Sequence, residues 1–246
     1  MSGHSHWATI KHKKAAADAK KGKAFSKVVK LIMAAAKKGG GDPKNNLKLL
    51  YALEKAKDCN LPKDTIEKAI KKGTGELEGV TYDDVTYEGY GPGGCAVMVD
   101  ALTDNRNRTV SEIRKIFDHK GGNLGDSGCV GFMFEKKGIL LIPRGTLTED
   151  AAMELGLEIG AEDVQPADDQ FEIVCAPADF AAVVGALKAK NIETSSASIV
   201  RVAKTRVDLP NDKAKGALGL MDALEEHDDV QEIASNFNLP EGFVSL

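Results

Sequence analysis

The order of strands and helices between residues 139 and 203 is the feature that most limits what this chain can fold into. Apolar runs and helical periodicity predict six elements in turn: strand Ile139–Ile142, helix Thr148–Leu157, a short strand near Val164, strand Phe171–Cys175, helix Asp179–Lys190 and strand Ser198–Ala203. This β-α-β-β-α-β order is that of a split βαβ unit, which forms a complete sheet by itself. We therefore expect a ferredoxin-like domain here.

The elements on either side of this unit predict a second sheet. Before it come strands and a helix separated by glycine-rich turns: strand Thr81–Glu88, strand Ala96–Leu102, helix Thr109–Lys120, loop Gly121–Gly128 and strand Cys129–Phe134. After Pro210 the chain offers only one helix and a last strand around Val230–Asn236. These late elements have no partner left in sequence. We expect them to return to the first sheet, which makes the ferredoxin-like unit an insertion.

The first third of the chain predicts three short amphipathic helices. The first is stopped by Gly39-Gly40-Gly41, the second starts at Asp42-Pro43 as acidic N-cap and first-turn proline, and the third starts at Leu61-Pro62 and ends at Gly73. Their predicted apolar faces are Phe25, Val28, Val29, Ile32, Ala35 and Ala36, then Leu49, Leu50, Leu53 and Ala56, then Ile66, Ala69 and Ile70. Such helices bury a common core only by packing together.

The sequence thus predicts an α+β multidomain protein with an N-terminal three-helix domain followed by two α/β domains, the ferredoxin-like one inserted into the other. The predicted boundaries are residues 1–76 for the basic helical domain, 77–136 plus 206–246 for the discontinuous α/β domain, and 137–205 for the insertion.

Charge is divided unevenly along the chain. Residues 1–75 contain eighteen lysines, no arginine and six acidic residues, whereas the remainder contains fifteen basic and thirty-one acidic residues. The net charge of −4 is therefore the sum of +12 and −16. Such a split predicts one end that binds nucleic acid and one that repels it. The alternative is that lysine-rich helices only keep the protein soluble.

The opening residues carry the predicted contact. They hold the only tryptophan and three of the five histidines beside a dense run of lysines. Lysines attract phosphates, and an indole can stack on a base. The predicted nucleic-acid-binding residues are His4, Trp7, Lys11, His12, Lys13, Lys14, Lys20, Lys21 and Lys23. A solvated terminus is the competing interpretation. Chelation of a metal by His4, His6 and His12 is chemically possible, and we expect it to be incidental.

Other sequence patterns argue against several classes of protein. No apolar run reaches the roughly 18 residues of a membrane span, and no secretory signal is recognised, so we expect a cytoplasmic protein. The four separated cysteines favour reduced thiols. Gly121–Gly128 follows a helix rather than a strand, unlike a nucleotide-binding loop. We find no catalytic constellation and expect no cofactor, no metal site and no enzymatic activity.

Two charged clusters remain ambiguous. Arg106 and Arg108 precede a predicted helix, where they can bind phosphate or pair with acidic neighbours while Asp104 or Asn107 caps the helix. We favour the structural role. His227 lies among acidic residues, and we expect it at a solvated helix end.

These motifs together closely resemble the YebC/PmpR family over essentially the whole chain. The residues that carry the resemblance are Gly3-His4-Ser5, Trp7, Ile10–Lys14, Asp18-Ala19-Lys20, Leu61–Asp64, Tyr87–Gly94, Asp104–Thr109 and Gly121–Gly128. His6 and Asp126 depart from the usual lysine and glutamate. The resemblance implies a cytoplasmic protein of three domains, a helical bundle and two α/β domains with one inserted in the other.

The resemblance implies two functions for the basic end. Some family members are described as transcriptional regulators that bind promoter DNA. Others resemble translation factors that bind rRNA or tRNA on the ribosome and relieve stalling at sequences such as proline runs. Lysines attract phosphate without the bidentate geometry that reads guanine, and a tryptophan stacks on an unpaired base, which favours RNA slightly. The family's usual description favours DNA. An acidic scaffold that binds a basic protein is a further alternative.

Overall fold

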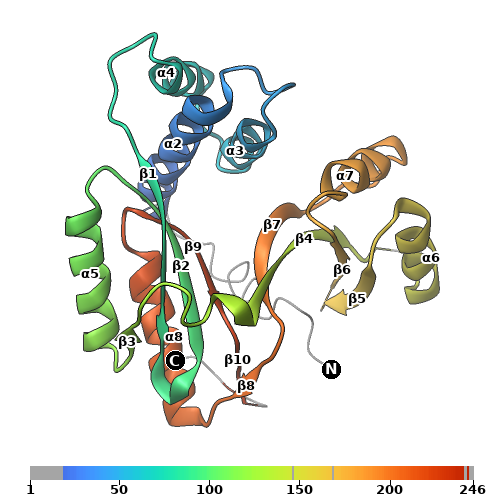
Figure 1. Cartoon of the computed structure of the whole chain (residues 1–246). Coiled ribbons are helices and arrows are strands. Elements are labelled where there is room, and N and C mark those ends of the chain that lie inside the picture. The colour runs from blue at the N-terminus through green and yellow to red at the C-terminus, as the bar shows by residue number, and fades with distance from the viewer. Residues whose placement is uncertain (1–18, 146, 168, 241–242, 244–246) are drawn as a thin grey trace. The chain divides into compact units, whose positions relative to one another are not determined.

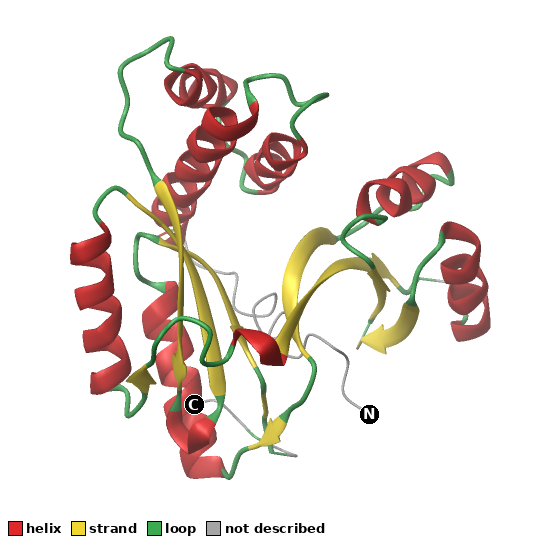
Figure 2. Ribbon diagram, viewed as in Figure 1, coloured by secondary structure: helices red, strands yellow, loops and turns green. Residues whose placement is uncertain are grey.

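The computed structural model describes residues 19–145, 147–167, 169–240 and 243, with the side chains from residue 22 onward (Figure 1). The described chain divides into two compact units, one formed by Phe132–Arg206 and the other by the residues before and after it. Figure 2 shows that both units combine helices with a sheet, which confirms the predicted α+β class. In the part of the chain that is described, no helix is both long and apolar enough to span a membrane. The predicted domain boundaries stay a prediction.

The larger unit begins with three packed helices, as the sequence predicts. They are α2 (Ala19–Gly39), α3 (Leu47–Asp58) and α4 (Lys63–Thr74). Their shared core is built from one apolar face of each helix, including Ile32, Ala36, Leu49, Ala52, Ala56 and Ala69. The lysines on the opposite faces remain outside this core.

The start of α3 differs from the prediction. Asp42 and Pro43 form a turn in which the Asp42 carboxylate accepts hydrogen bonds from the backbone and side chain of the following residues. The N-cap is Asn46, whose Oδ1 accepts from the Leu49 N–H at 3.1 Å while its Nδ2 donates to the Ala35 carbonyl at 2.9 Å. A buried asparagine that ties α3 to the end of α2 therefore replaces the predicted proline start.

Two smaller expectations for these helices are also wrong. Leu50 is 38% exposed, and Ala52 takes its place in the buried face of α3. Helix α4 continues to Thr74, and Gly75 rather than Gly73 adopts the left-handed conformation that ends it. Gly73 is instead a packing position, because a Cβ there would lie 2.5 Å from the Met33 carbonyl oxygen.

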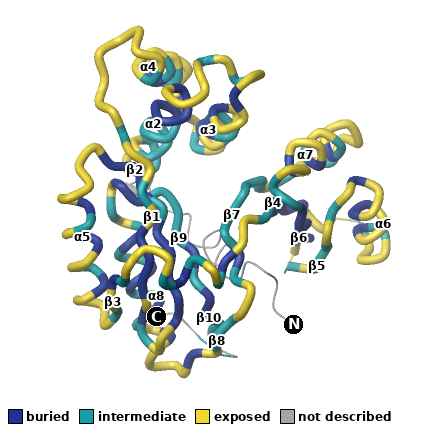
Figure 3. Tube along the Cα trace, viewed as in Figure 1, coloured by how far each residue is buried: buried dark blue, intermediate teal, exposed yellow. Residues whose placement is uncertain are grey.

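The larger unit continues into a four-stranded sheet. Its strands are β1 (Asp83–Tyr90), β2 (Ala96–Thr103), β3 (Asn123–Leu124) and β9 (Val230–Ser235), in the order β3-β1-β2-β9. Every residue of β2 except Asp100 is buried, and the middle of this sheet is dark blue in Figure 3. Because β9 pairs with β2, the end of the chain does return to the first sheet, as predicted.

Helices α5 (Arg106–His119) and α8 (Asn211–Glu225) pack against each other and against this sheet. A short 3-10 turn, η1 (Pro92–Gly94), joins β1 to β2, and a parallel pair, β8 (Val207–Asp208) and β10 (Phe237–Asn238), lies at the chain's return. The N-cap of α5 is Asn105, not Asp104 or Asn107, since its side chain accepts from the Arg108 N–H.

The strand predicted at Cys129–Phe134 is wrong. Gly131–Met133 forms the 3-10 turn η2, and strand β4 begins only at Phe134. The N–H groups of Gly128, Val130 and Gly131 donate to the Glu88 carboxylate instead of to a neighbouring strand. A side chain thus replaces the strand partner that the pattern predicted.

The smaller unit is the predicted ferredoxin-like fold. Its elements are β4 (Phe134–Pro143), α6 (Glu149–Ile159), β5 (Asp163–Ala167), β6 (Gln170–Cys175), α7 (Phe180–Ala189) and β7 (Ser196–Ala203). The sheet order is β5-β6-β4-β7, and every neighbouring pair is antiparallel. This order is the one that a split βαβ unit requires.

Candidate nucleic-acid interface

Most of the predicted binding residues lie outside the described part of the chain. These are His4, Trp7, Lys11, His12, Lys13 and Lys14. Lys20 and Lys21 fall on the first turn of α2, where the structure describes the backbone but not these side chains. Lys23 is the one predicted residue whose side chain is described. The described interface therefore has to be built from the remaining lysines of the helical part.

Three lysines on one face of α2 bind the end of α8. Lys23, Lys27 and Lys30 are spaced by four and three residues, which places them on the same side of the helix. Their ammonium groups donate to the carbonyl oxygens of residues 226, 225 and 228 at 3.2, 2.6 and 3.2 Å. A helix C-terminus carries partial negative charge, so this is a favourable place for cations. Lys23 is thus engaged within the protein.

Asp229 is the centre of this contact. Its side chain is 4% exposed and receives hydrogen bonds from Lys30 Nζ at 2.7 Å, Arg108 Nη2 at 2.7 Å and Thr109 Oγ1 at 2.8 Å. Burial alone would raise the pKa of Asp229, but the hydrogen bonds from Lys30, Arg108 and Thr109 outweigh burial and lower the pKa to about 2. Asp229 is therefore ionised at neutral pH and holds α2, α5 and the start of β9 together. Nothing in the sequence pattern marks it among the neighbouring acidic residues.

Lys23 is exposed, and so are the lysines that follow Lys30 in the helical part. Lys38 forms an ion pair with Asp84 of β1. The exposed lysines that remain are spread over the end of α2, the following turn, α3 and α4: Lys37, Lys44, Lys48, Lys55, Lys57, Lys63, Lys68, Lys71 and Lys72. A surface of lysines without arginine attracts phosphate by charge and does not provide the fork geometry that reads a guanine edge.

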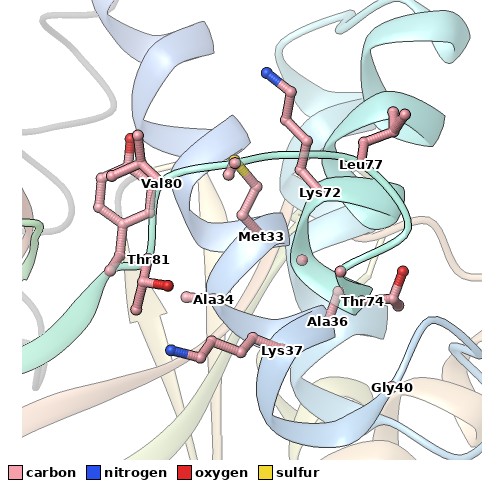
Figure 4. Close-up of a pocket in the computed structure, with 14 residues that line it drawn as sticks. Met33, Ala34, Ala36, Lys37, Gly40, Lys72, Thr74, Leu77, Val80 and Thr81 are labelled. Atoms are coloured by element: carbon pink, nitrogen blue, oxygen red, sulfur yellow. The ribbon is translucent and has the colours of Figure 1, made fainter.

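A cavity of about 520 Å³ lies between α2, α4 and the segment that leads to β1. Figure 4 shows Lys37 and Lys72 on opposite sides of Met33, with Leu77 and Val80 on the connecting segment. The residues that line the cavity include no aspartate, glutamate, histidine or cysteine. The cavity thus joins apolar surface to two cations and contains no acid–base pair.

The glycine-rich loop at residues 121–128 is not an open phosphate cradle. Glu88 is 7% exposed, and its carboxylate accepts from the N–H groups of Gly128, Val130 and Gly131 at 2.8, 2.9 and 2.7 Å. The carboxylate thus takes the Gly128 donor, and the N–H groups of Gly121, Gly122 and Gly125 donate to backbone carbonyls, so these four donors are already used within the protein. This finding agrees with the expectation that the loop is structural.

The two arginines in the first turn of α5 also have internal partners. Arg106 Nε lies 3.0 Å from Asp83, and Arg108 Nη2 lies 2.9 Å from Asp104 in addition to its bond with Asp229. The structural role favoured from the sequence is confirmed for this pair. Arg108 reaches the buried Asp229 and helps to hold α5 in place, whereas the Arg106–Asp83 pair is exposed on both sides and adds little.

The expectation for His227 is wrong. The side chain is 11% exposed, its Nε2 lies 2.9 Å from the Glu112 carboxylate, and its Nδ1 accepts from the Asp229 N–H at 3.1 Å. Since Nδ1 is the acceptor, the proton of the neutral ring lies on Nε2. The histidine orients the turn that carries Asp229. Within the described residues, no three His, Cys, Asp or Glu side chains are grouped to hold a metal ion.

Comparison with known proteins identifies the family. Residues 5–76 match the family model described as the TACO1/YebC protein N-terminal domain, and residues 82–237 match the model described as the TACO1/YebC second and third domain. The chain belongs to the TACO1/YebC family. The resemblance seen in the sequence is thereby confirmed.

Relatives in this family match the chain from end to end. A "Probable transcriptional regulatory protein" of Desulforapulum autotrophicum is 52% identical over 241 residues, which cover 98% of each chain. One of Dictyoglomus turgidum, with the same description, is 52% identical over 242 residues, covering 98% of this chain and 97% of the relative. A crystal structure of a conserved hypothetical protein from Aquifex aeolicus is 45% identical and has a TM-score of 0.89, covering 98% of this chain and 100% of that one.

Proposed function

We propose that this TACO1/YebC protein is a non-enzymatic regulator of transcription that binds DNA through its lysine-rich N-terminal part. The observation that carries the proposal is the charge division, with eighteen lysines and no arginine in residues 1–75. Ten of these lysines, counting Lys38 with its ion pair to Asp84, are exposed at the end of α2, in the turn after it and on α3 and α4. The names of the relatives as probable transcriptional regulatory proteins support the same function.

The contact is expected to depend on charge more than on base sequence. The lysines neutralise phosphates, and Lys11, Lys13, Lys14, Lys20 and Lys21 extend the surface beyond the described side chains. His4, Trp7, His12 and Lys23 complete the proposed contact, and the exposed ammonium of Lys23 also donates to the Glu226 carbonyl. The acidic remainder of the chain repels the same polyanion, so it fixes which end of the molecule binds. A cytoplasmic location is part of the proposal.

Salt-dependent binding tests the proposal. Affinity for duplex DNA should fall linearly on a double-logarithmic plot against salt, with a slope of about −0.9 for each phosphate that is neutralised. Ribosomes, tRNA and single-stranded RNA should be titrated in parallel. A clear preference for ribosomes or unpaired RNA over duplex DNA would assign the basic part to translation instead. Failure to bind any of them in dilute buffer would refute the proposal. It would favour the alternative that the protein is a scaffold whose acidic part binds a basic protein.

A further inference from the structure

The face of α2 that holds Lys23, Lys27 and Lys30 belongs to the basic part of the chain, yet it binds the acidic part. The five residues that it meets, Glu225 to Asp229, contain four carboxylates. Figure 1 shows the N-terminal end of α2 beside the C-terminal end of α8. We call the three lysines together with residues 225–229 the latch.

The acceptors of the latch are negatively polarised oxygens, the same kind of acceptor that a phosphate would offer these lysines. Lys23 and Lys27 bond to carbonyl oxygens at the C-terminus of α8, and Lys30 bonds to the Asp228 carbonyl in the turn after the helix and to the Asp229 carboxylate. Each ammonium thus bonds to an oxygen with partial or full negative charge. Lys30 also lies over the Tyr82 ring, 5.5 Å from its centroid. A phosphate that approached this face would meet the carboxylates of the same turn. Like-charge repulsion therefore opposes binding of nucleic acid here while the latch is closed.

The chain between the two sides of the latch includes an exposed segment without helix or strand. Residues 75–81, which connect α4 to the segment before β1, are in neither helix nor strand beyond the end of α4, and all seven are exposed. The Lys38–Asp84 pair, with each side chain 51% exposed, is a surface ion pair and adds little to hold the helices in place. The buried Asp229 is the strongest single anchor of the contact.

We propose that the latch is an internal competitor of nucleic acid, so that full binding requires α2 to leave the end of α8. This inference rests on the proposed function and adds a regulatory element to it. In the closed state the three lysines are not available to nucleic acid. The free energy needed to release them makes the free energy of binding less favourable by the same amount. Binding of nucleic acid then favours the open latch, and closure of the latch weakens binding.

A matched pair of substitutions tests the competition. Asp229→Asn removes the carboxylate shared by Lys30 and Arg108, whereas Asp104→Asn removes the other carboxylate bound to Arg108 and leaves Lys30 untouched. Both changes add the same charge to the molecule. For a 20-base-pair duplex, Asp229→Asn should bind roughly fivefold or more tightly than wild type, with Asp104→Asn unchanged. The salt slope of Asp229→Asn should also steepen by about 0.9 for each lysine released.

A distance measurement tests release in a chain whose latch is intact. Spin labels are placed at Glu67→Cys on α4 and Lys215→Cys on α8, both exposed, after replacement of Cys59 and Cys129 by serine. Saturating duplex DNA should shift or broaden the distance distribution. An unchanged distribution in the bound protein, or equal affinities for the two asparagine variants, overturns the latch alone. Absence of binding by the wild type overturns the proposed function and the latch with it.

Discussion

The carboxylate of Glu88 lies 2.7 Å from the backbone nitrogen of Gly131, although 43 positions separate the two residues in sequence. The same carboxylate accepts from Gly128 and Val130, and the Glu88 carbonyl accepts from Gly125. One strand residue therefore holds the second half of the glycine-rich loop and the turn that follows it. The glycine-rich loop resembles an anion-binding motif, but in this protein the anion at its end is the Glu88 carboxylate of the same chain.

Substitution of Glu88 by glutamine should destabilise the larger unit. Glutamine keeps the shape but replaces one acceptor oxygen with an NH₂ group, which faces backbone donors. We expect a loss of about 2–4 kcal/mol in the free energy of unfolding, because a buried donor loses a charged acceptor. Urea denaturation measures the change. Glu67→Gln, on the exposed face of α4, is the control and should shift it by less than about 0.5 kcal/mol. Equal midpoints for the two variants would contradict this role of Glu88.

The contribution of Asp229 to the stability of the protein should disappear at acid pH. The pKa of Asp229 is lowered to about 2 from its ordinary 3.8, so ionised Asp229 stabilises the fold above about pH 4, and this contribution is lost as the pH falls towards 2. This lowering of the Asp229 pKa corresponds to about 2 kcal/mol in the free energy of unfolding. The difference in unfolding free energy between wild type and Asp229→Asn should be largest at pH 6 and should narrow between pH 4 and 2. A difference that does not vary with pH would show that the charge is unimportant.

The crossing of α2 and α4 should not tolerate a side chain at Gly73. A Cβ at this position would lie 2.5 Å from the Met33 carbonyl oxygen and 2.7 Å from the Ala36 Cβ, so the helices would have to separate. Gly73→Ala should cost about 1–3 kcal/mol by overpacking. Gly219→Ala in α8 is the matched control, since nothing lies within 4 Å of its Cβ and alanine improves helix propensity by up to about 1 kcal/mol. Thermal denaturation of the two variants should therefore shift in opposite directions.

The two kinds of binding side chain at the N-terminus should separate DNA from RNA. Lys13→Ala should weaken binding to duplex DNA and unpaired RNA alike and reduce the salt slope by about one phosphate contact. Trp7→Ala should leave duplex affinity nearly unchanged, because an intact duplex offers little for an indole to stack on. Fluorescence anisotropy with both nucleic acids measures the pair. A loss of about 1–3 kcal/mol for unpaired RNA only, after Trp7→Ala, would favour RNA as the target.

Local chemistry explains which predictions were confirmed. The ferredoxin-like order followed from the alternation of apolar strands and helices between residues 139 and 203, because each pattern is set by side chains close in sequence. The return of β9 to β2 followed from counting strands without partners. The second helix was misplaced at Pro43 because Asn46, through bonds to α2 as well as to its own helix, supplies a better cap.

Periodicity and composition were enough to predict the fold class, the inserted unit and the separation of a basic end from an acidic one. Which charged side chains meet became visible only in the folded protein. Lys30 and Asp229 are 199 positions apart and form a 2.7 Å ion pair, and the Glu88 carboxylate accepts from backbone N–H groups 40 to 43 positions away. Such pairings depend on where folded elements bring their surfaces together, and no local pattern of residues encodes that position.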